Sequence, residues 1–338
     1  MELIVRYDDY EEMRKFFRLM DEFGYENIHR MSREDISDNR TQCVCVDSHD
    51  KCYFPLNVTC AAGAASAGGR FYLVDELEMI LMDNFKDRPR QVVFHVPHDG
   101  FEFPEDLMES VCIPQDKFMR LHEDMRDKDI GFAVPKAFNH RPNLLSFRTS
   151  RLLCDVERFT GEEGIMNQFG TGYCYEKAYN GMRIKNITPE LLEATRRYYD
   201  RHHSELDRIA RTFHKLLLID LHSYRDEIVP ETFRTDEPMP DVCIGTDDKF
   251  TDSRLTEDAV RVFTELGFSV EINYPYRGSM IPDCIMSGEI KSNFQTIMLE
   301  FNRRCYLRDS KMDNEANQTI QNAIKKIILA SHKIDTQE

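Results

Sequence analysis

The stretch LLLIDLHS, residues 216–223, begins as an unbroken apolar run and then carries two ionisable side chains, Asp220 and His222. Short apolar runs of this kind are typical of strands buried on both faces, as the strands of parallel sheets are. Similar runs occur at residues 91–96, 268–272 and 296–301, and residues 146–156 are a further candidate.

Amphipathic segments lie between these strands. Thr188 and Pro189 have the composition of a helix start, a capping hydroxyl followed by proline, and apolar residues at helical spacing continue to about residue 215. Further helices are expected at about residues 256–266, ended by Gly267, and at about residues 314–333. Buried strands that alternate with helices predict an α/β fold with a mainly parallel sheet.

Residues 1–88 have a different pattern, which predicts a small α/β unit of its own. A helix is expected at residues 10–23 and a strand at 71–74, and the other predicted elements are two short strands within 41–55 and a short helix at 76–84. The polar segment Asp87-Arg88-Pro89-Arg90 is the expected boundary, so that residues 89–338 form the second domain. The sequence indicates no role for the first unit and no oligomeric state.

The charge balance restricts the possible partners. The 338 residues include 44 Lys and Arg against 60 Asp and Glu, a net charge of −16, which argues against a nucleic-acid-binding protein. A local basic pocket for a small anion remains compatible with this total. No apolar run approaches the roughly 20 residues of a membrane span, so no membrane partner is expected. The ten cysteines are most simply free thiols, and we expect a cytoplasmic location.

Polar side chains, most of them ionisable, follow or end the predicted strands. His98 follows residues 91–96, His222 ends the run that begins at Leu216, Asn273 follows residues 268–272, and Glu300 lies near the end of the last run. Such groups are costly to bury without a partner or a metal ion, and the carboxyl ends of parallel strands line one crevice. Two histidines and a glutamate at this edge therefore suggest a metal centre with an acid/base group.

The local sequences add detail to this hypothesis. The segment Pro97-His98-Asp99-Gly100 is expected to place His98 in a tight turn, with a glycine that is able to adopt a positive φ. Asp220 and His222 are two residues apart on one strand and so share a face, which would allow Asp220 to orient a metal-bound imidazole. His95 points to the other face from Val96, and we interpret it as a structural residue.

Five motifs occur in order between about residues 90 and 310: PHDGFEFP (97–104), RLLCDVER (151–158), DLHS (220–223), NYPYRG (273–278) and LEFNRRCY (299–306). Together they resemble the N-formylglutamate amidohydrolase family, which is similar in turn to zinc carboxypeptidases and to succinylglutamate desuccinylase or aspartoacylase. The resemblance implies a three-layer phosphorylase/hydrolase-like α/β fold with a mixed, mainly parallel sheet and one catalytic Zn²⁺. It does not extend to the N-terminal unit.

The resemblance also implies roles for individual residues. His98 and His222 would be metal ligands, and Glu300 the general base of an amide hydrolysis. The third ligand is best matched by Asp127, with Glu102, Asp124 and Asp129 as alternatives, since Phe101 stands where the carboxypeptidase pattern has a glutamate. Arg151 or Arg148 would lie near the reacting carbonyl.

The expected substrate is a small anionic N-acyl amino acid, N-formylglutamate-like, or a small peptide. Its carboxylate would be held by Arg158 or Arg277, because guanidinium groups bind carboxylates in a planar fork. The remaining substrate-binding candidates are Asn273, Gly278 and His203, although a packing role for His203 and a surface ion pair for Arg277 are equally simple interpretations.

One position departs from the pattern of the family that the chain resembles. The usual D-x-N-R reads Asp155-Val156-Glu157-Arg158 here, and an acid beside Arg158 is expected to weaken capture of a dicarboxylic amino acid. The alternative is therefore that the protein is a catalytically inactive family member, which acts as an anion-binding, ligand-binding or regulatory protein. A redox protein is disfavoured because the chain contains no C-x-x-C.

Overall fold

The computed structural model of the chain describes residues 2–6, 10–22, 26–27, 43–47, 52–55, 71–74, 77, 90–138, 143–161, 164–213 and 215–334. By internal contacts the chain divides into two compact units: residues 1–88 with 211–214, and residues 89–210 with 215–338. Among the described residues, no helix is long and apolar enough to cross a membrane.

In the described residues of the first unit, a sheet in the order β2-β4-β3-β1-β5 accompanies the helix α1. Its elements are β1 (Glu2–Arg6), α1 (Tyr10–Glu22), β2 (Glu26–Asn27), β3 (Cys43–Asp47), β4 (Cys52–Pro55) and β5 (Phe71–Leu73). Helical spacing places Phe16 and Met20 on one face of α1, where they are buried with Val5 and Val44 of the sheet. The predicted helix at 10–23 and the strands are confirmed, whereas nearly all of the predicted helix at 76–84 lies outside the described residues.

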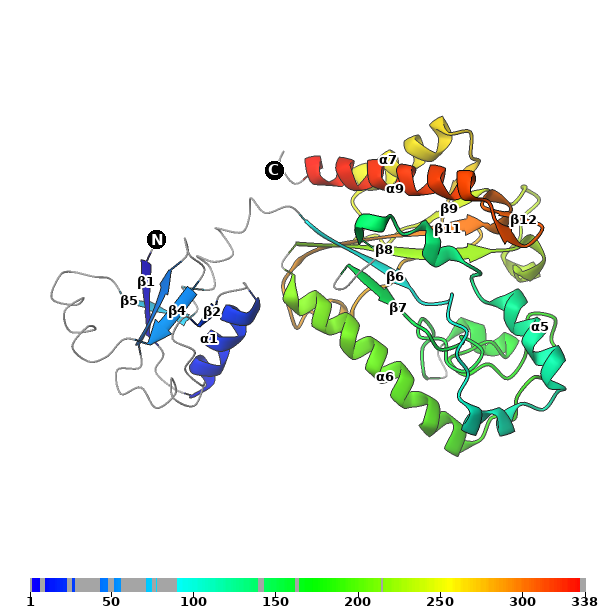
Figure 1. The fold of residues 1–338 in the computed structure, drawn as a ribbon, viewed down its shortest axis with the longest axis horizontal. Helices are drawn as coiled ribbons and strands as arrows, with labels where there is room; N and C mark the ends of the chain where they lie inside the picture. The colour runs from blue at the N-terminus through cyan, green and yellow to red at the C-terminus, as the bar shows by residue number, and fades with distance from the viewer. Residues whose placement is uncertain are drawn as a thin grey trace. The chain divides into compact units, whose positions relative to one another are not determined.

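The second unit is built on a six-stranded sheet in the order β10-β9-β11-β8-β6-β7 (Figure 1). Its strands are β6 (Gln91–Val96), β7 (Leu144–Ser146), β8 (Lys215–Tyr224), β9 (Val242–Gly245), β10 (Val270–Ile272) and β11 (Asn293–Asn302). Neighbouring strands are parallel except for the antiparallel pair β9–β11. The mixed, mainly parallel sheet predicted from the sequence is therefore confirmed.

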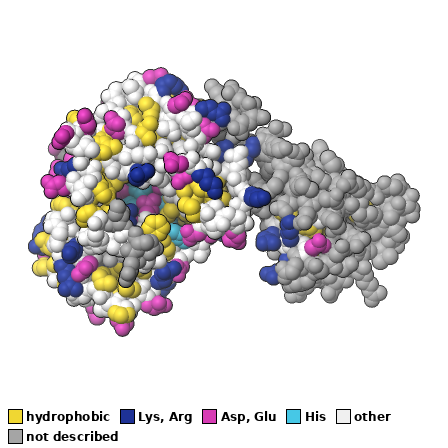
Figure 2. All heavy atoms as spheres, turned by 180° about the vertical axis from the view of Figure 1, so that it is seen from behind, with side chains coloured by type: hydrophobic (Ala, Val, Ile, Leu, Met, Phe, Trp, Pro, Cys, Tyr) yellow, Lys and Arg dark blue, Asp and Glu magenta, His cyan; other side chains and the backbone are white. Residues whose placement is uncertain are grey.

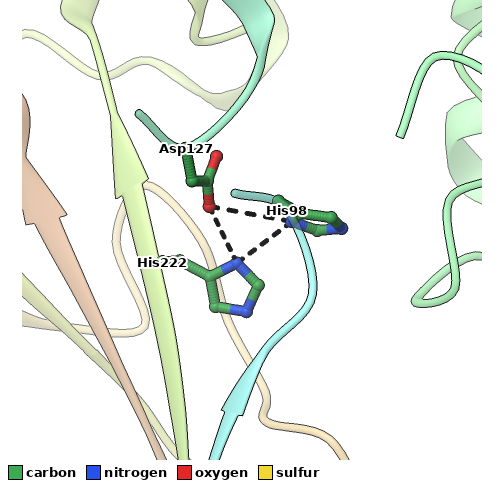
Figure 3. A group of neighbouring side chains, drawn as sticks. All are labelled: His98, Asp127 and His222. Carbon is green, nitrogen blue, oxygen red and sulfur yellow. Dashed lines mark hydrogen bonds and ion pairs between the residues drawn. The ribbon is translucent and has the colours of Figure 1, made fainter. Parts of the chain in front are cut away.

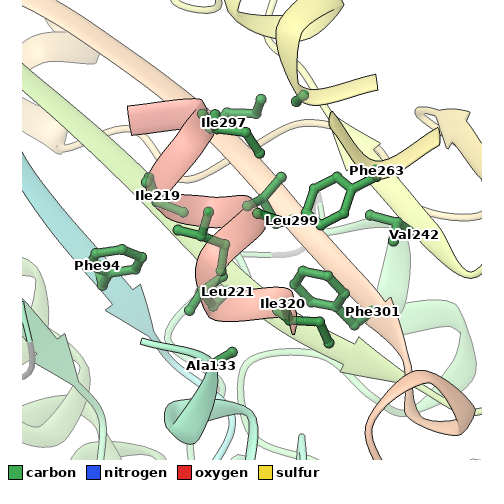
Figure 4. Close-up of a cluster of buried hydrophobic side chains, with 14 of the residues drawn as sticks. Phe94, Ala133, Ile219, Leu221, Val242, Phe263, Ile297, Leu299, Phe301 and Ile320 are labelled. Atoms are coloured by element: carbon green, nitrogen blue, oxygen red, sulfur yellow. The ribbon is translucent and has the colours of Figure 1, made fainter. Parts of the chain in front are cut away.

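Helices on both faces complete a three-layer arrangement. Helices α7 (Ser253–Glu265) and α9 (Asn314–Ile334) lie along one face, and α6 (Pro189–Thr212) lies on the other (Figure 1). Alternate residues of β8 and β11 pack beneath α7 and α9 in the main hydrophobic cluster (Figure 4), including Leu217, Ile219, Leu221, Ile297, Leu299 and Phe301.

Two details of the helix termini follow from their sequence. The Thr188 hydroxyl accepts a hydrogen bond from the backbone N–H of Leu191 at 3.2 Å, which confirms Thr188 as the cap of α6. Gly267 has φ +86° directly after the end of α7, a left-handed conformation that glycine adopts without steric cost.

One candidate strand is wrong, one strand was missed, and one glycine is needed for a different reason. Residues 146–156 do not form a strand: β7 ends at Ser146, and turns follow from Arg151 to Val156. Strand β9, which lies between β10 and β11 in the sheet, was not predicted because its VCIG sequence is short and ends in glycine. Gly100 does not have a positive φ; it is required because a Cβ there would lie 2.4 Å from the carbonyl oxygen of Phe147 and 2.5 Å from that of Thr149.

The remaining regular elements are short, apart from α5. Among the described residues they are α5 (Gln115–Met125), α8 (Asp283–Met286), β12 (Leu307–Arg308) and β13 (Lys311–Met312), together with seven 3₁₀ turns. Helix α5 is followed within two residues by Asp127, so it delivers this carboxylate to the edge of the sheet.

Candidate metal centre

The sheet brings three ionisable side chains to its carboxyl edge. His98 lies two residues past the end of β6, and His222 lies near the end of the neighbouring strand β8. Glu300, on β11, is directly opposite His222 in the parallel register. His98, His222 and Glu300 are buried, with 2 %, 4 % and 7 % of their surfaces exposed. Parallel register therefore gathers residues that are about 200 positions apart in the sequence.

Asp127 joins the two histidines from a loop (Figure 3). Its backbone N–H donates to the carbonyl oxygen of His98 at 2.9 Å, which fixes the loop beside β6. One carboxylate oxygen, Oδ2, lies 3.2 Å from Nδ1 of His222 and 3.7 Å from Nδ1 of His98, and it accepts a hydrogen bond from the backbone N–H of Ser223. The other oxygen accepts from Arg151 at 3.2 Å.

The three ligand atoms have the spacing that a tetrahedral ion requires. The Nδ1 atoms of His98 and His222 are 3.1 Å apart, and the other two separations are 3.2 and 3.7 Å. Ligand atoms at 2.0–2.1 Å from a tetrahedral zinc ion lie about 3.3–3.4 Å from one another. Two imidazoles and a carboxylate are also a common donor set for catalytic zinc. His98, Asp127 and His222 therefore fit a zinc ion.

The far nitrogen of each imidazole faces a carboxylate. Nε2 of His98 lies 2.9 Å from Oδ1 of Asp155, and Nε2 of His222 lies 3.1 Å from Oδ1 of Asp220. Such a carboxylate fixes the orientation of the ring and leaves the near nitrogen available for a metal. Asp220 was expected in this position. Asp155 was not, although it belongs to the RLLCDVER motif, and its spacing to the arginines was the signal that could have identified it.

Two arginines lie around Asp155. Arg151 donates to Asp155 at 3.0 Å, and Nε of Arg158 is 3.7 Å from the same oxygen, which also accepts from the Tyr175 hydroxyl at 2.8 Å. Burial would raise the pKa of Asp155, but Arg158, His98 and Arg151 hold it well below its usual range. Within the part of the chain that the structure describes, the Arg158 guanidinium makes no hydrogen bond, so its fork is available to a ligand.

Glu300 has the properties of an acid/base group. Its carboxylate makes no hydrogen bond to any described residue, and burial, helped by the charge of Asp127, raises its pKa to about 7 against the attraction of His222 and Arg151. A group with a pKa near neutrality can both accept and release a proton under physiological conditions.

The histidines lie in an acidic environment. Burial alone would lower the pKa of His222, yet Glu157, Asp220 and Asp127 raise it well above its ordinary value. Burial and Arg151 likewise lower the pKa of His98, but the neighbouring carboxylates outweigh them and raise it. This arrangement favours positive charge at the centre, either as protons or as a metal cation. In Figure 2, histidine and acidic side chains are visible in a hollow of the larger unit, with Lys or Arg side chains nearby.

Glu157 is the acid that the sequence places next to Arg158, where it was expected to weaken capture of a dicarboxylic amino acid. Its carboxylate lies among imidazole rings instead, 3.3 Å from Nε2 of His222, 3.5 Å from Nε2 of His98 and 3.7 Å from Nδ1 of His95. No ion pair joins it to Arg158 among the described residues.

The three alternative ligands are engaged elsewhere. Glu102 is exposed and pairs with Arg148 at 2.7 Å, Asp124 pairs with Arg225 at 2.8 Å, and Asp129 pairs with Arg126 at 3.3 Å. Of the four acids considered from the sequence, Asp127 is the one that meets the two histidines.

The other proposed site residues make no hydrogen bond or ion pair with His98, Asp127 or His222 among the described residues. Arg148 and Arg277 are exposed. Asn273 is partly buried, and its side-chain oxygen accepts from the backbone N–H of Thr246 at 2.9 Å, shaping the turn that ends at Gly278, where φ is +84°. His203 donates from Nε2 to the carbonyl oxygen of Val156 at 2.8 Å and stacks on Tyr199. None of these contacts tests a role in substrate binding.

The larger unit is thus an α/β sheet whose carboxyl edge carries a buried His–Asp–His group and, beside it, a glutamate that makes no hydrogen bond to a described residue. The sequence model of N-formylglutamate amidohydrolase matches residues 90–307. The chain belongs to this family of amidohydrolases, as its motifs had predicted.

Solved structures agree on the fold. An N-formylglutamate amidohydrolase from Ralstonia eutropha JMP134 is 19% identical, with a TM-score of 0.56 over 74% of this chain and 94% of that one. A gene product from Agrobacterium tumefaciens is 18% identical, with a TM-score of 0.52 over 72% of this chain and 90% of that one. A comparison with curated proteins found no match. At these identities the likeness supports the α/β architecture alone.

Proposed function

We propose that this protein is a zinc-dependent amidohydrolase that cleaves the amide bond of a small anionic N-acyl amino acid, N-formylglutamate-like, or of a small peptide. The observation that carries the proposal is the tetrahedral spacing of His98, Asp127 and His222 beside the buried carboxylate of Glu300, which makes no hydrogen bond to a described residue. Membership of an amidohydrolase family supports the reaction class.

His98, Asp127 and His222 would hold the zinc ion. A zinc ion bound there supplies Lewis acidity, which polarises a carbonyl group and makes water a stronger acid. Asp155 and Asp220 keep the two imidazoles in the orientation in which Nδ1 faces the ion.

The chain's own residues then supply proton transfer and charge. The Glu300 carboxylate accepts the proton of the attacking water and later delivers a proton to the leaving amine, which its pKa near 7 permits. Arg151, held between Asp127 and Asp155, places a fixed positive charge where the oxyanion develops. Arg158 binds a carboxylate of the substrate through its guanidinium group, which makes no hydrogen bond to a described residue.

The proposal is tested by metal analysis and by hydrolysis of a panel of N-acyl amino acids and dipeptides, with and without added Zn²⁺. We expect bound zinc, zinc-dependent hydrolysis of at least one panel member, and loss of both in Asp127→Asn. The matched control is Asp124→Asn, because Asp124 lies three residues away and pairs with Arg225 outside the centre. It should retain both properties.

The outcomes separate the alternatives. Absence of bound zinc together with absence of zinc-dependent hydrolysis would contradict the proposal. Zinc bound with full occupancy but no hydrolysis of any panel member would instead favour the catalytically inactive, ligand-binding alternative.

A further inference from the structure

A second group of ligand atoms lies behind the proposed zinc site. It consists of Nδ1 of His95, Oε1 of Glu157, Oδ1 of Asp220 and Nε2 of His222. We propose that this chain binds a second divalent transition-metal ion through these four atoms, with the His222 ring bridging the two ions. The proposal extends the proposed function, since it shares His222 with the zinc site.

Four of the separations among these atoms resemble those of a tetrahedral site. Oδ1 of Asp220 lies 2.8 Å from Nδ1 of His95 and 3.1 Å from Nε2 of His222, and Oε1 of Glu157 lies 3.3 Å from Nε2 of His222 and 3.7 Å from Nδ1 of His95. They scatter around the roughly 3.3–3.4 Å expected of ligands at zinc distances. Each imidazole nitrogen is therefore within reach of both carboxylates.

Hydrogen bonding among these residues leaves one carboxylate unsatisfied. Both His95 and His222 direct a ring nitrogen at the same oxygen of Asp220. The carboxylate of Glu157 makes ion-pair contacts to imidazoles but accepts no hydrogen bond from a described side chain. A carboxylate that is only 14 % exposed and lacks such a bond is costly unless a cation compensates it. A metal ion bound by both carboxylates would supply that compensation.

The far side of His95 has the contact that a metal-bound imidazole needs. Its Nε2 lies 2.8 Å from Nε2 of His202, which is buried on α6. A partner at the far nitrogen fixes the ring so that Nδ1 points to the ligand group. The histidine interpreted from the sequence as structural is thus oriented as a ligand would be.

The charges of the donor set suit two divalent ions. Asp127, Glu157 and Asp220 contribute three negative charges, and a bridging His222 loses its remaining N–H proton and contributes a fourth. Two divalent cations neutralise these four charges. Imidazole and carboxylate donors together suit Zn²⁺, Fe²⁺, Ni²⁺ or Cu²⁺ rather than Mg²⁺ or Ca²⁺.

The site depends on the residue in which this chain departs from D-x-N-R. A carboxylate at position 157 is a far better ligand than the neutral amide of asparagine. Glu157 is also the most exposed of the four ligands, so it lies where an ion would enter: His95, Asp220 and His222 are 0 %, 1 % and 4 % exposed.

The test is the number of Zn²⁺ ions bound per chain, measured by elemental analysis after dialysis. We expect two in the wild-type protein and one in Glu157→Gln, with the hydrolytic zinc retained. Glu102→Gln is the matched control, because Glu102 is an exposed glutamate paired with Arg148, and it should keep two. His95→Asn provides a second route to the one-ion state if Glu157→Gln does not fold.

A spectroscopic measurement distinguishes a bridged pair from an unrelated surface ion. Two Cu²⁺ ions joined by an imidazole ring are magnetically coupled, whereas the Glu157→Gln protein should give the electron paramagnetic resonance signal of an isolated Cu²⁺ ion. One zinc per wild-type chain, unchanged by Glu157→Gln, would overturn the second site and leave the zinc amidohydrolase intact. No zinc at all would overturn both, and two ions without magnetic coupling would reject the shared histidine.

Discussion

The two faces of the strand pair β8–β11 make opposite use of the same backbone. The strands pair in parallel register over ten residues, with Leu299 opposite Leu221 and Glu300 opposite His222. On one face, Leu221 and Leu299 are fully buried under α7 and α9 in an apolar cluster. On the other face, one residue further along, an imidazole and a carboxylate are buried together.

The difference shows how a single strand carries both stability and chemistry. The apolar face stabilises the fold through area removed from water, which requires only shape and volume. The polar face is tolerated because each ionisable group has a partner, such as Asp220 for His222, or a use, such as proton transfer for Glu300. Substitutions on the first face should therefore change stability, and substitutions on the second should change activity.

The largest expected effect is on the polar face, in Glu300→Gln. Without a proton acceptor, kcat should fall by about 10²- to 10⁴-fold, equivalent to about 2.7–5.5 kcal/mol in the activation barrier. Bound zinc should be unchanged, because Glu300 is not one of the proposed ligands. Steady-state kinetics and metal analysis check this together, with the exposed Glu271→Gln on β10 as the control. Full activity in Glu300→Gln would remove Glu300 from the base role.

On the apolar face, Leu299→Ala should produce the converse result. Removing a fully buried leucine leaves a cavity, and the free energy of unfolding should fall by about 2–5 kcal/mol. The kcat of the protein that remains folded should be nearly unchanged. Urea unfolding and kinetics at low temperature measure the two quantities, and Leu266→Ala, at the exposed end of α7, is the control. A large loss of kcat without loss of stability would break the division between the faces.

Sequence patterns predicted these faces well because they depend on local periodicity. The apolar runs of β6, β8 and β11 mark buried strands, and the ionisable residue at each end marks the edge where the chemistry lies. Strand β9 escaped prediction because its four residues contain too little pattern to distinguish a strand from a loop. Its place beside β11 comes from tertiary pairing.

The sequence could not determine the contacts of the site residues that lie in loops. Asp127 was one of four possible ligands, and the choice rests on a backbone hydrogen bond from its N–H to His98, which no spacing rule reveals. Glu157 was expected beside Arg158, but the turn after β7 directs its side chain to the imidazoles of His222 and His98. Side-chain direction in irregular segments depends on contacts that are distant in sequence.

A smaller effect is expected in Arg158→Ala, at the side chain proposed to bind the substrate carboxylate. Loss of a charge-assisted hydrogen bond to a substrate carboxylate costs about 1.5–3 kcal/mol, so kcat/KM should fall by about 10- to 100-fold, mostly through KM. A substrate whose carboxylate is amidated should show little difference between the wild-type protein and the variant. Equal losses for both substrates would mean that Arg158 acts by holding Asp155 rather than by binding the carboxylate.

The pH dependence of kcat/KM should report Glu300. The carboxylate acts as a base only when it is ionised, so activity should rise with pH and fall about tenfold per pH unit below its pKa. Burial raises this pKa to about 7. A zinc ion nearby favours the ionised form, so the acid limb should lie at or below about pH 7. The residual activity of Glu300→Gln should lack this limb, and an unchanged limb would assign it to another group.

The smallest effect is expected in Arg148→Ala, because this arginine is exposed. The Arg148 side chain is 80 % exposed and pairs with the exposed Glu102, and an ion pair of this kind contributes about 0–1 kcal/mol to stability. No described contact links Arg148 to His98, Asp127 or His222, so kcat should change less than about twofold, a barrier difference under about 0.5 kcal/mol. The measurement is the kcat of Arg148→Ala compared with that of Arg151→Ala, because Arg151 contacts both Asp127 and Asp155. If Arg148→Ala lost as much kcat as Arg151→Ala, the positive charge that stabilises the oxyanion would come from the exposed Arg148. The catalytic residues would then extend beyond the buried polar face of β8 and β11.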